Sequence, residues 1–384
     1  MSLLWTSWGV LLLSCLFIGH SQVESRGLFG ARNKKTGEAM INLAATDLLK
    51  SNLTTVFFPI IYIFTLAVGL PTNAMAIWVF LFRTKKKHPA AIYMANLALA
   101  DLLFVIWLPL KIAYHLNGNN WTYGEAMCKV LVGFFYGNMY CSVLFITCLS
   151  VQRYWVVAHP LSQQRWNNRL SIVVSVAVWA FVCVSTTPLY LYDQTVKLQD
   201  PNVTSCHDVN LIHNVKEPFQ DVKHPYYYFM TMAGLVCFLP SVVIIAAYVL
   251  LLRALSRSVE DSSSGKKRRK VVVLIIIVLI TFLVCFIPSN IMLVVHYALL
   301  SFGAANRAYG FYITTLCLSS LNSCLDPIIY YYVSEEFREH VKNTLLCRSN
   351  RTVERMRIPL KYSKKRNEYT PSRSVLECFV AERR

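Results

Sequence analysis

Asn322-Ser323-Cys324-Leu325-Asp326-Pro327-Ile328-Ile329-Tyr330 lies within a long apolar stretch near the carboxyl end of the chain. Amide and carboxylate side chains are costly in an apolar environment, so polar residues placed there usually have a function. A proline removes a backbone hydrogen bond, and a helix through this stretch can therefore kink. These nine residues indicate a membrane-spanning helix that carries both a polar site and a bend.

The composition of the whole chain also indicates a membrane protein. Of its 384 residues, 55% are hydrophobic, and the mean hydropathy is +0.43. The net charge of +18 would suggest nucleic-acid binding in a soluble protein. Here, however, the basic residues cluster in short runs between apolar stretches. We therefore expect a lipid bilayer as a partner and no nucleic acid.

Seven apolar stretches are long enough to cross about 30 Å of hydrocarbon as helices that rise about 1.5 Å per residue. Backbone groups in lipid must bond internally, which requires helices rather than an open sheet. The predicted fold class is an all-α membrane protein with a seven-transmembrane helix bundle at 54–333. The stretches are Thr54–Phe82, Ala90–Leu116, Ala126–Ala158, Leu170–Tyr192, Tyr226–Arg253, Val271–Leu300 and Ala308–Val333.

Basic runs set the orientation of these spans. They follow the first span, separate the third from the fourth, precede the sixth and continue after the seventh. Because Lys and Arg favour cytosolic loops, we expect a multi-pass plasma-membrane protein whose amino terminus is extracellular. Glycosylation sequons at Asn52, Asn120 and Asn202 all fall on the predicted outer side.

The amino-terminal apolar run, Leu3–Ile18, is short for a membrane span and is followed by Gly19-His20-Ser21. This pattern predicts a cleaved signal peptide at 1–21, with an uncleaved amino-terminal anchor as the alternative.

After the spans, an amphipathic juxtamembrane helix is expected at 334–347, followed by a cytoplasmic tail at 348–384. Cys347 is a candidate palmitoylation site, with an unmodified thiol as the alternative. The apolar residues that share one face of this helix are Phe337, Val341 and Leu345.

Polar residues and prolines recur through the other spans in a fixed order. The order and spacing resemble those of the rhodopsin-like G-protein-coupled receptors over all seven spans. A transporter is the alternative, but it should show internal repeats, and we find none. No enzyme constellation is present, so no catalytic residue is proposed. The motifs are Gly69–Asn73, Asn96–Asp101, Gln152-Arg153-Tyr154, Trp179, Pro240 and Cys285–Pro288.

The resemblance implies a sodium site at Asp101, with Ser142, Asn322 and Asp326 nearby. A buried carboxylate must be neutralised by a proton or a cation. A hydrogen-bonded structural pair is the alternative. Apart from this Na⁺, no cofactor is expected.

The resemblance also implies a disulfide between Cys128 and Cys206. It further implies a switch region that couples the receptor to heterotrimeric G proteins and a phosphorylated tail that binds arrestin. Two residues depart from the family pattern, since Gln152 replaces an acidic residue and Phe286 replaces Trp. The implied switch and coupling residues are Arg153, Phe282, Phe286, Pro288 and Tyr330.

Three further segments are similar to the protease-activated receptors: Cys206–Val209, His88–Asn96 and Phe134–Ser142. Such a receptor is cut by a trypsin-like serine protease and is activated by its own new amino terminus. The matching site is Arg26, followed by Gly27, which makes 22–26 a removable propeptide. The tethered ligand would be Gly27-Leu28-Phe29-Gly30-Ala31-Arg32, in an outer tail at 27–53.

A flexible segment from Asn33 to Lys50 is expected to join this ligand to the membrane domain and to give it an effective concentration on the order of mM. Asp208 is the expected partner of the new ammonium group, and calcium-mobilising coupling is the implied output. The alternative is a receptor for a diffusible peptide or lipid, in which Arg26 is an ordinary tail residue. The implied pocket residues are Tyr62, Tyr136, His207, Asp208, Tyr309 and Tyr312.

Overall fold

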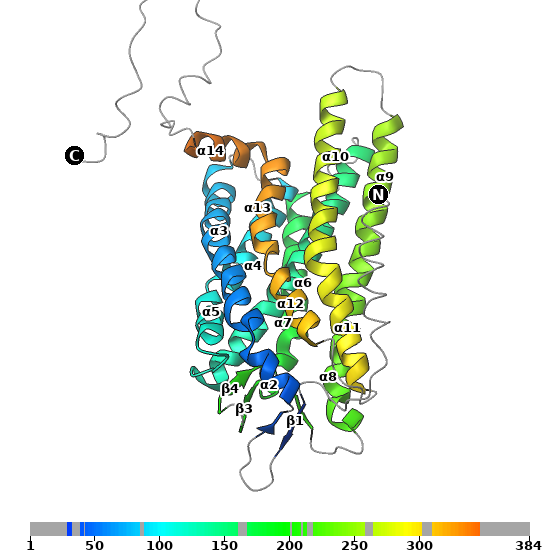
Figure 1. Ribbon diagram of the computed structural model, residues 1–384. Coiled ribbons are helices and arrows are strands. Elements are labelled where there is room, and N and C mark those ends of the chain that lie inside the picture. Colours follow the sequence, from blue (N-terminus) through cyan, green and yellow to red (C-terminus); the bar gives the residue numbers. More distant parts are fainter. Residues whose placement is uncertain are drawn as a thin grey trace, which may run out of the picture.

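The computed structural model describes residues 29–32, 39–41, 43–84, 88–159, 167–199, 202–208, 210–212, 218–257, 264–301 and 309–345. The predicted signal peptide, Arg26, Gly27, Leu28, Cys347 and the cytoplasmic tail lie outside these residues. Figure 1 shows the helices as one elongated bundle, with small strands at one end and the short helix α14 (Glu335–Leu345) at the other.

The predicted bundle of seven spans is confirmed. Five spans are continuous helices, and the second and seventh each consist of two shorter helices separated by a two-residue turn. In chain order the elements are η1 (Leu53–Phe57), α3 (Phe58–Trp78) and η2 (Val79–Arg83); α4 (Pro89–Val105) and α5 (Leu108–Leu116); α6 (Gly124–Ala158); α7 (Asn168–Leu191); α8 (Pro218–Met232), η4 (Ala233–Phe238) and α9 (Leu239–Arg257); α10 (Ser264–Thr281), η5 (Phe282–Phe286) and α11 (Ile287–Ser301); and α12 (Tyr309–Ser319) and α13 (Asn322–Val333).

The break in the seventh span has a local cause. The hydroxyls of Ser319 and Ser320 donate to the carbonyls of Leu316 at 2.7 Å and Cys317 at 2.6 Å, and such bonds compete with helical ones. Farther along, Pro327 cannot donate to the carbonyl of Ser323. That carbonyl instead accepts a bond of 2.8 Å from Asn73 of α3, so the freed group is satisfied within the bundle.

Wide helical turns precede three prolines. The π-helical segments η1, η4 and η5 end at Phe57, Phe238 and Phe286, two residues before Pro59, Pro240 and Pro288. A proline has no N–H to continue the helical pattern, and π turns are one way in which a helix accommodates that loss. Irregular turns therefore lie just before Pro240 and Pro288, two of the prolines in the family pattern.

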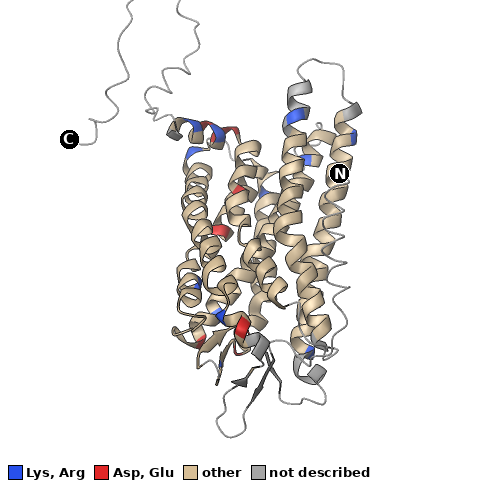
Figure 2. Cartoon of the chain, in the orientation of Figure 1, with Lys and Arg blue, Asp and Glu red and all other residues tan. Residues whose placement is uncertain are grey.

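Side-chain burial identifies the centre of the bundle. The most apolar stretch of α6 is 67% buried, whereas that of α7 is 28% buried. The helix α6 is therefore central and α7 peripheral. Large apolar side chains such as Val184, which is 73% exposed, cover the outside, as expected for a surface in contact with lipid. Charged residues lie mainly toward the two ends of the bundle (Figure 2).

The outer end is organised by two small sheets. Strands β3 (Thr195–Lys197) and β4 (Thr204–Cys206) form an antiparallel hairpin, and the predicted Cys128–Cys206 disulfide joins this hairpin to α6. In the second sheet, β1 (Phe29–Arg32) lies between β2 (Ala39–Met40) and β5 (Asn210–Ile212). It is antiparallel to β2 and parallel to β5.

The expectation of a flexible segment from Asn33 to Lys50 is wrong for much of that segment. Ala39–Met40 is a strand, and Leu43–Lys50 forms the helix α2. The chain orders here because apolar residues of α2 find partners on the second outer loop and on the seventh span.

At the inner end, α14 follows the seventh span as predicted. Phe337 is 2% exposed, with its ring 5.9 Å from those of Phe80 and Tyr330. The residue thus anchors α14 to the first and seventh spans.

Candidate functional site

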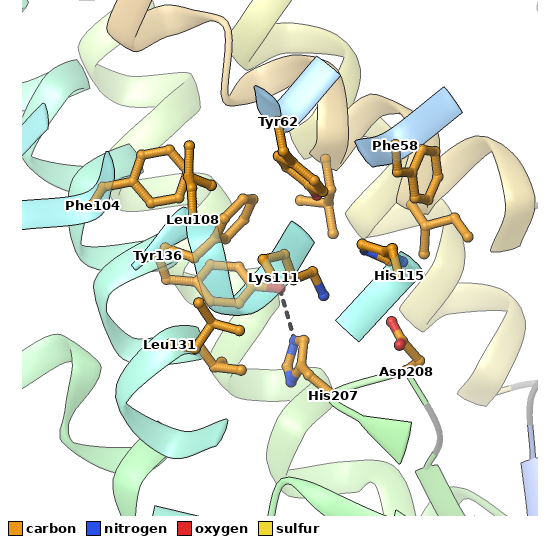
Figure 3. A pocket seen from close by; sticks show the side chains of 14 residues that line it. Phe58, Tyr62, Phe104, Leu108, Lys111, His115, Leu131, Tyr136, His207 and Asp208 are labelled. Atoms are coloured by element: carbon orange, nitrogen blue, oxygen red, sulfur yellow. Dashed lines mark hydrogen bonds between the residues drawn. The ribbon is translucent and has the colours of Figure 1, made fainter. Parts of the chain in front are cut away.

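A cavity of about 620 Å³, including its open mouth, lies at the outer end of the bundle. Its walls come from the first, second, third and seventh spans and from the loop after β4, so it joins segments that are far apart in the sequence (Figure 3). The lining residues are Phe58, Tyr62, Phe104, Leu108, Lys111, His115, Leu131, Val132, Phe135, Tyr136, His207, Asp208, Ile313 and Leu316.

The structure brings the six predicted pocket residues together. Tyr62, Tyr136, His207 and Asp208 line the cavity directly. Tyr309 and Tyr312 lie one contact away, through hydrogen bonds to Asp208 and to Tyr136.

His207 belongs to a chain of hydrogen bonds at the pocket wall. Its Nδ1 lies 2.7 Å from Oε1 of Gln194, an oxygen that can only accept, so Nδ1 carries the hydrogen. Nε2 therefore accepts from the Tyr136 hydroxyl at 3.2 Å (Figure 3). The same hydroxyl lies 3.1 Å from that of Tyr312. Burial away from water lowers the pKa of His207 from 6.5 to about 4, which keeps the ring neutral at pH 7.

Asp208 is the acidic group of the pocket. The Tyr114 hydroxyl donates to its Oδ2 at 2.5 Å, and the Tyr309 hydroxyl donates to its Oδ1 at 3.3 Å. Within the described part of the chain, the ion pairs join Lys129 to Glu125 and Asp193, so none of them neutralises Asp208. The site therefore holds a carboxylate that is stabilised by two neutral donors and can accept a cationic group.

Sequence reasoning missed three polar residues of this region, namely Lys111, Tyr114 and His115. Lys111 and His115 line the cavity, and the Lys111 ammonium lies 5.1 Å from the ring centre of Tyr114. The signal was present, because a lysine within an apolar span is costly and usually functional.

The loop that carries His207 and Asp208 is attached firmly to the third span. Both carboxylate oxygens of Glu125 accept hydrogen bonds from this loop. Oε1 accepts from the backbone N–H of Gln194 at 2.7 Å. Oε2 accepts from the backbone N–H of Thr195 at 2.9 Å and from the Thr195 hydroxyl. With the disulfide, these contacts hold the loop over the pocket.

The predicted polar core lies deep in the bundle. Asp101 Oδ1 accepts from Asn138 at 2.9 Å and from Ser323 at 2.8 Å, and Asn322 donates to Asp326 Oδ2 at 3.0 Å. Asn138 and Ser323 were not predicted. Ser142 is fully buried but makes no bond to Asp101.

Four oxygens of this core are buried without a hydrogen-bond partner: Asp101 Oδ2, Ser142 Oγ, Asn322 Oδ1 and Asp326 Oδ1. Each can act as a ligand for a hard cation, and two carboxylates supply negative charge to balance it. These four oxygens, two of them from carboxylates, form a donor set that fits a Na⁺ ion.

Near the inner end, Arg153 Nη2 donates to the carbonyl of Val333 at 3.0 Å, which joins the third span to the end of the seventh. The side-chain oxygen of Gln152 is buried without a partner. The Phe282 and Phe286 rings pack 5.1 Å apart in η5, just before Pro288, and the buried Tyr330 ring lies 5.7 Å from that of Phe80.

The three predicted sequon asparagines all lie at the outer end. Asn52 and Asn202 are exposed. Asn120 is partly buried, and its side-chain oxygen accepts from the Thr204 amide at 3.0 Å.

Comparison with known proteins agrees with this architecture. A family model described as 7 transmembrane receptor (rhodopsin family) matches residues 72–330. Proteinase-activated receptor 2 of Mus musculus is 48% identical over 97% of this chain and 97% of its own length. The Homo sapiens receptor of that name is 52% identical over 87% of this chain and 83% of its own. Proteinase-activated receptor 3 of Homo sapiens is 38% identical over 76% and 75%. This chain therefore belongs to the rhodopsin family of seven-transmembrane receptors and, within it, to the proteinase-activated receptors.

Proposed function

We propose that a trypsin-like serine protease activates this receptor by cutting after Arg26. The cut exposes the ammonium of Gly27, and Gly27–Arg32 then acts as a tethered ligand for the outer pocket. Arg26 suits the acidic primary pocket of such a protease. The names of the relatives, Proteinase-activated receptor 2 and 3, support this assignment.

The observation that carries the proposal is the Asp208 carboxylate, which has two tyrosine donors and no ion pair within the described residues. A peptide amino terminus would supply a direct ionic partner for this carboxylate. Charge-assisted hydrogen bonds of this kind are stronger than neutral ones.

The pairing of β1 with β5 also supports the ligand's amino terminus as the partner of Asp208. Phe29 lies opposite Asn210, and Gly30 lies opposite Leu211. β5 begins two residues after Asp208, so this pairing holds the ligand segment beside the loop that carries the carboxylate.

Sodium binding at Asp101, Ser142, Asn322 and Asp326 is part of the proposal and is supported by their unpartnered oxygens. When bound there, Na⁺ supplies positive charge between the two carboxylates. The protein contributes the buried oxygens, and the bonds from Asn138 and Ser323 hold Asp101 in place.

On the cytosolic side, we propose that Arg153 meets the G protein after leaving the carbonyl of Val333. Signalling would then proceed through calcium and phosphoinositides, and phosphorylated tail residues would recruit arrestin.

A calcium assay in transfected cells tests the proposal. Trypsin should activate the wild type and fail on Arg26→Ala, while the free peptide GLFGAR amide should activate both. A full trypsin response from Arg26→Ala would show that the cut lies elsewhere. A free peptide that is silent on the wild type would refute the tethered ligand and favour a diffusible ligand.

A further inference from the structure

The helix α2 lies between β1, the strand formed by residues 29–32 of the proposed ligand, and the membrane domain (Figure 1). It is the connection between the proposed ligand and the first span, so its attachment decides how far the ligand can move. We propose that α2 is a docked anchor that shortens the tether and thereby raises the effective concentration of the ligand at the pocket. This inference rests on the proposed protease activation.

The outer loop forms one side of the docking site. Leu49 is 3% exposed and packs in an apolar cluster with Val196 and Leu198 of the second outer loop. The neighbouring Leu48 side chain lies against Gly310 at the start of α12. The helix is thus held between the second outer loop and the seventh span.

The carboxyl end of α2 is fastened by hydrogen bonds. The Thr54 hydroxyl lies 3.2 Å from the carbonyl of Leu48 and 3.0 Å from that of Leu49. Ser51 donates to the Leu48 carbonyl at 2.6 Å. Carbonyls at a helix end need partners outside the helix, and these two hydroxyls supply them.

Asn119, in the loop that follows the second span, completes the attachment. It is 1% exposed, and its φ of 60° is in the left-handed region, which asparagine tolerates better than most residues. Its amide donates to the Leu49 carbonyl at 2.5 Å and to the Thr54 hydroxyl at 3.0 Å. Its oxygen lies 2.6 Å from Nδ1 of His115, a pocket residue.

The consequence for the tether follows from chain length. With α2 docked, ten residues, 33–42, connect the end of the proposed ligand to the start of α2, and two of them form β2, which pairs with the ligand segment itself. With α2 released, the number is eighteen, 33–50. Effective concentration falls roughly as the −3/2 power of length, so release should lower it about two- to threefold.

The experiment compares tethered and free ligand on the same receptors. Leu49→Ala and Leu198→Ala weaken the contact from its two sides, and neither residue lines the pocket. Lys50→Ala is the matched control, since Lys50 is exposed on the same helix. All variants are made in a Leu28→Ala background, where the weakened ligand keeps occupancy below saturation. Surface expression is measured in parallel.

We expect Leu49→Ala and Leu198→Ala to lower the maximal trypsin response about two- to threefold, with the potency of free GLFGAR amide unchanged and Lys50→Ala without effect. Equal losses for trypsin and free peptide, or no loss for either, would overturn the anchor while leaving protease activation intact. Free peptide that fails on the wild type would instead refute the proposed function, and the anchor with it.

Discussion

The charge on Asp208 can be tested by removing it without removing its shape. Asp208→Asn keeps an oxygen that can accept from Tyr114 or Tyr309, so the change chiefly removes the negative charge. Two unit charges about 4 Å apart interact by about 4 kcal/mol at an effective dielectric constant of 20, before the cost of desolvation. Losing one partner of a desolvated pair costs about 2–5 kcal/mol. Taking about 2–3 kcal/mol, we expect the EC50 of GLFGAR amide to rise about 30- to 150-fold.

The assay is a double-mutant cycle in which the second change is made on the peptide. Amino-terminal acetylation removes the ammonium, so acetylated peptide should be weaker by a similar factor on the wild type. On Asp208→Asn, acetylation should cost less than about threefold, because the partner charge is already gone.

The matched control for this cycle is Asp193→Asn. The Asp193 side chain is 86% exposed, and its bond to Lys129 is a surface ion pair of small energy. The control should shift the EC50 less than about twofold. If acetylation weakens the peptide equally on wild type and Asp208→Asn, the two groups are not coupled, and Asp208 does not bind the ammonium.

Two further predictions concern the polar core and the pocket histidine. Replacing Na⁺ with choline should raise the potency of the free peptide on the wild type but not on Asp101→Asn, and equal shifts in both would place any sodium effect outside this core. The folded-state pKa of His207, lowered from 6.5 to about 4, means that the unfolded chain binds the proton at higher pH. His207 should therefore contribute full stability at pH 7 and lose roughly 1–2 kcal/mol by pH 5. The melting temperature of purified receptor should fall between pH 7 and pH 5, and it should fall less in His207→Gln. An equal fall in His207→Gln would assign the loss of stability to other groups.

Much of the fold could be predicted because its causes lie within single segments. Each span is marked by its own length and hydropathy, which lipid imposes on any helix that crosses it. The Cys128–Cys206 disulfide followed from the family resemblance and is present. The convergence of Tyr62, Tyr136 and Asp208 on one cavity also followed from that resemblance, since nothing in their spacing along the chain indicates it.

What could not be predicted depends on contacts between distant segments. Eight residues, Leu43–Lys50, are too few for a stable isolated helix, and α2 is stabilised by Leu198 and Asn119, which come much later in the chain. Lys111 shows the opposite case. Its charge within an apolar span was a visible signal, but only the folded structure shows that it lines the cavity with Asp208.

The contacts described above converge on the seventh span, which suggests why this receptor can function without two of the usual switch residues. Tyr309 and Tyr312 connect α12 to Asp208 and to Tyr136 at the pocket. At the start of α13, Ser323 bonds to Asp101 through its hydroxyl and to Asn73 through its carbonyl. At the end of α13, the Val333 carbonyl holds Arg153. A shift of this span alters all three sets of contacts at once. If Arg153 couples the receptor to the G protein as proposed, its release needs no carboxylate at position 152 to depend on the ligand, because the Val333 carbonyl belongs to the span whose outer end contacts the pocket.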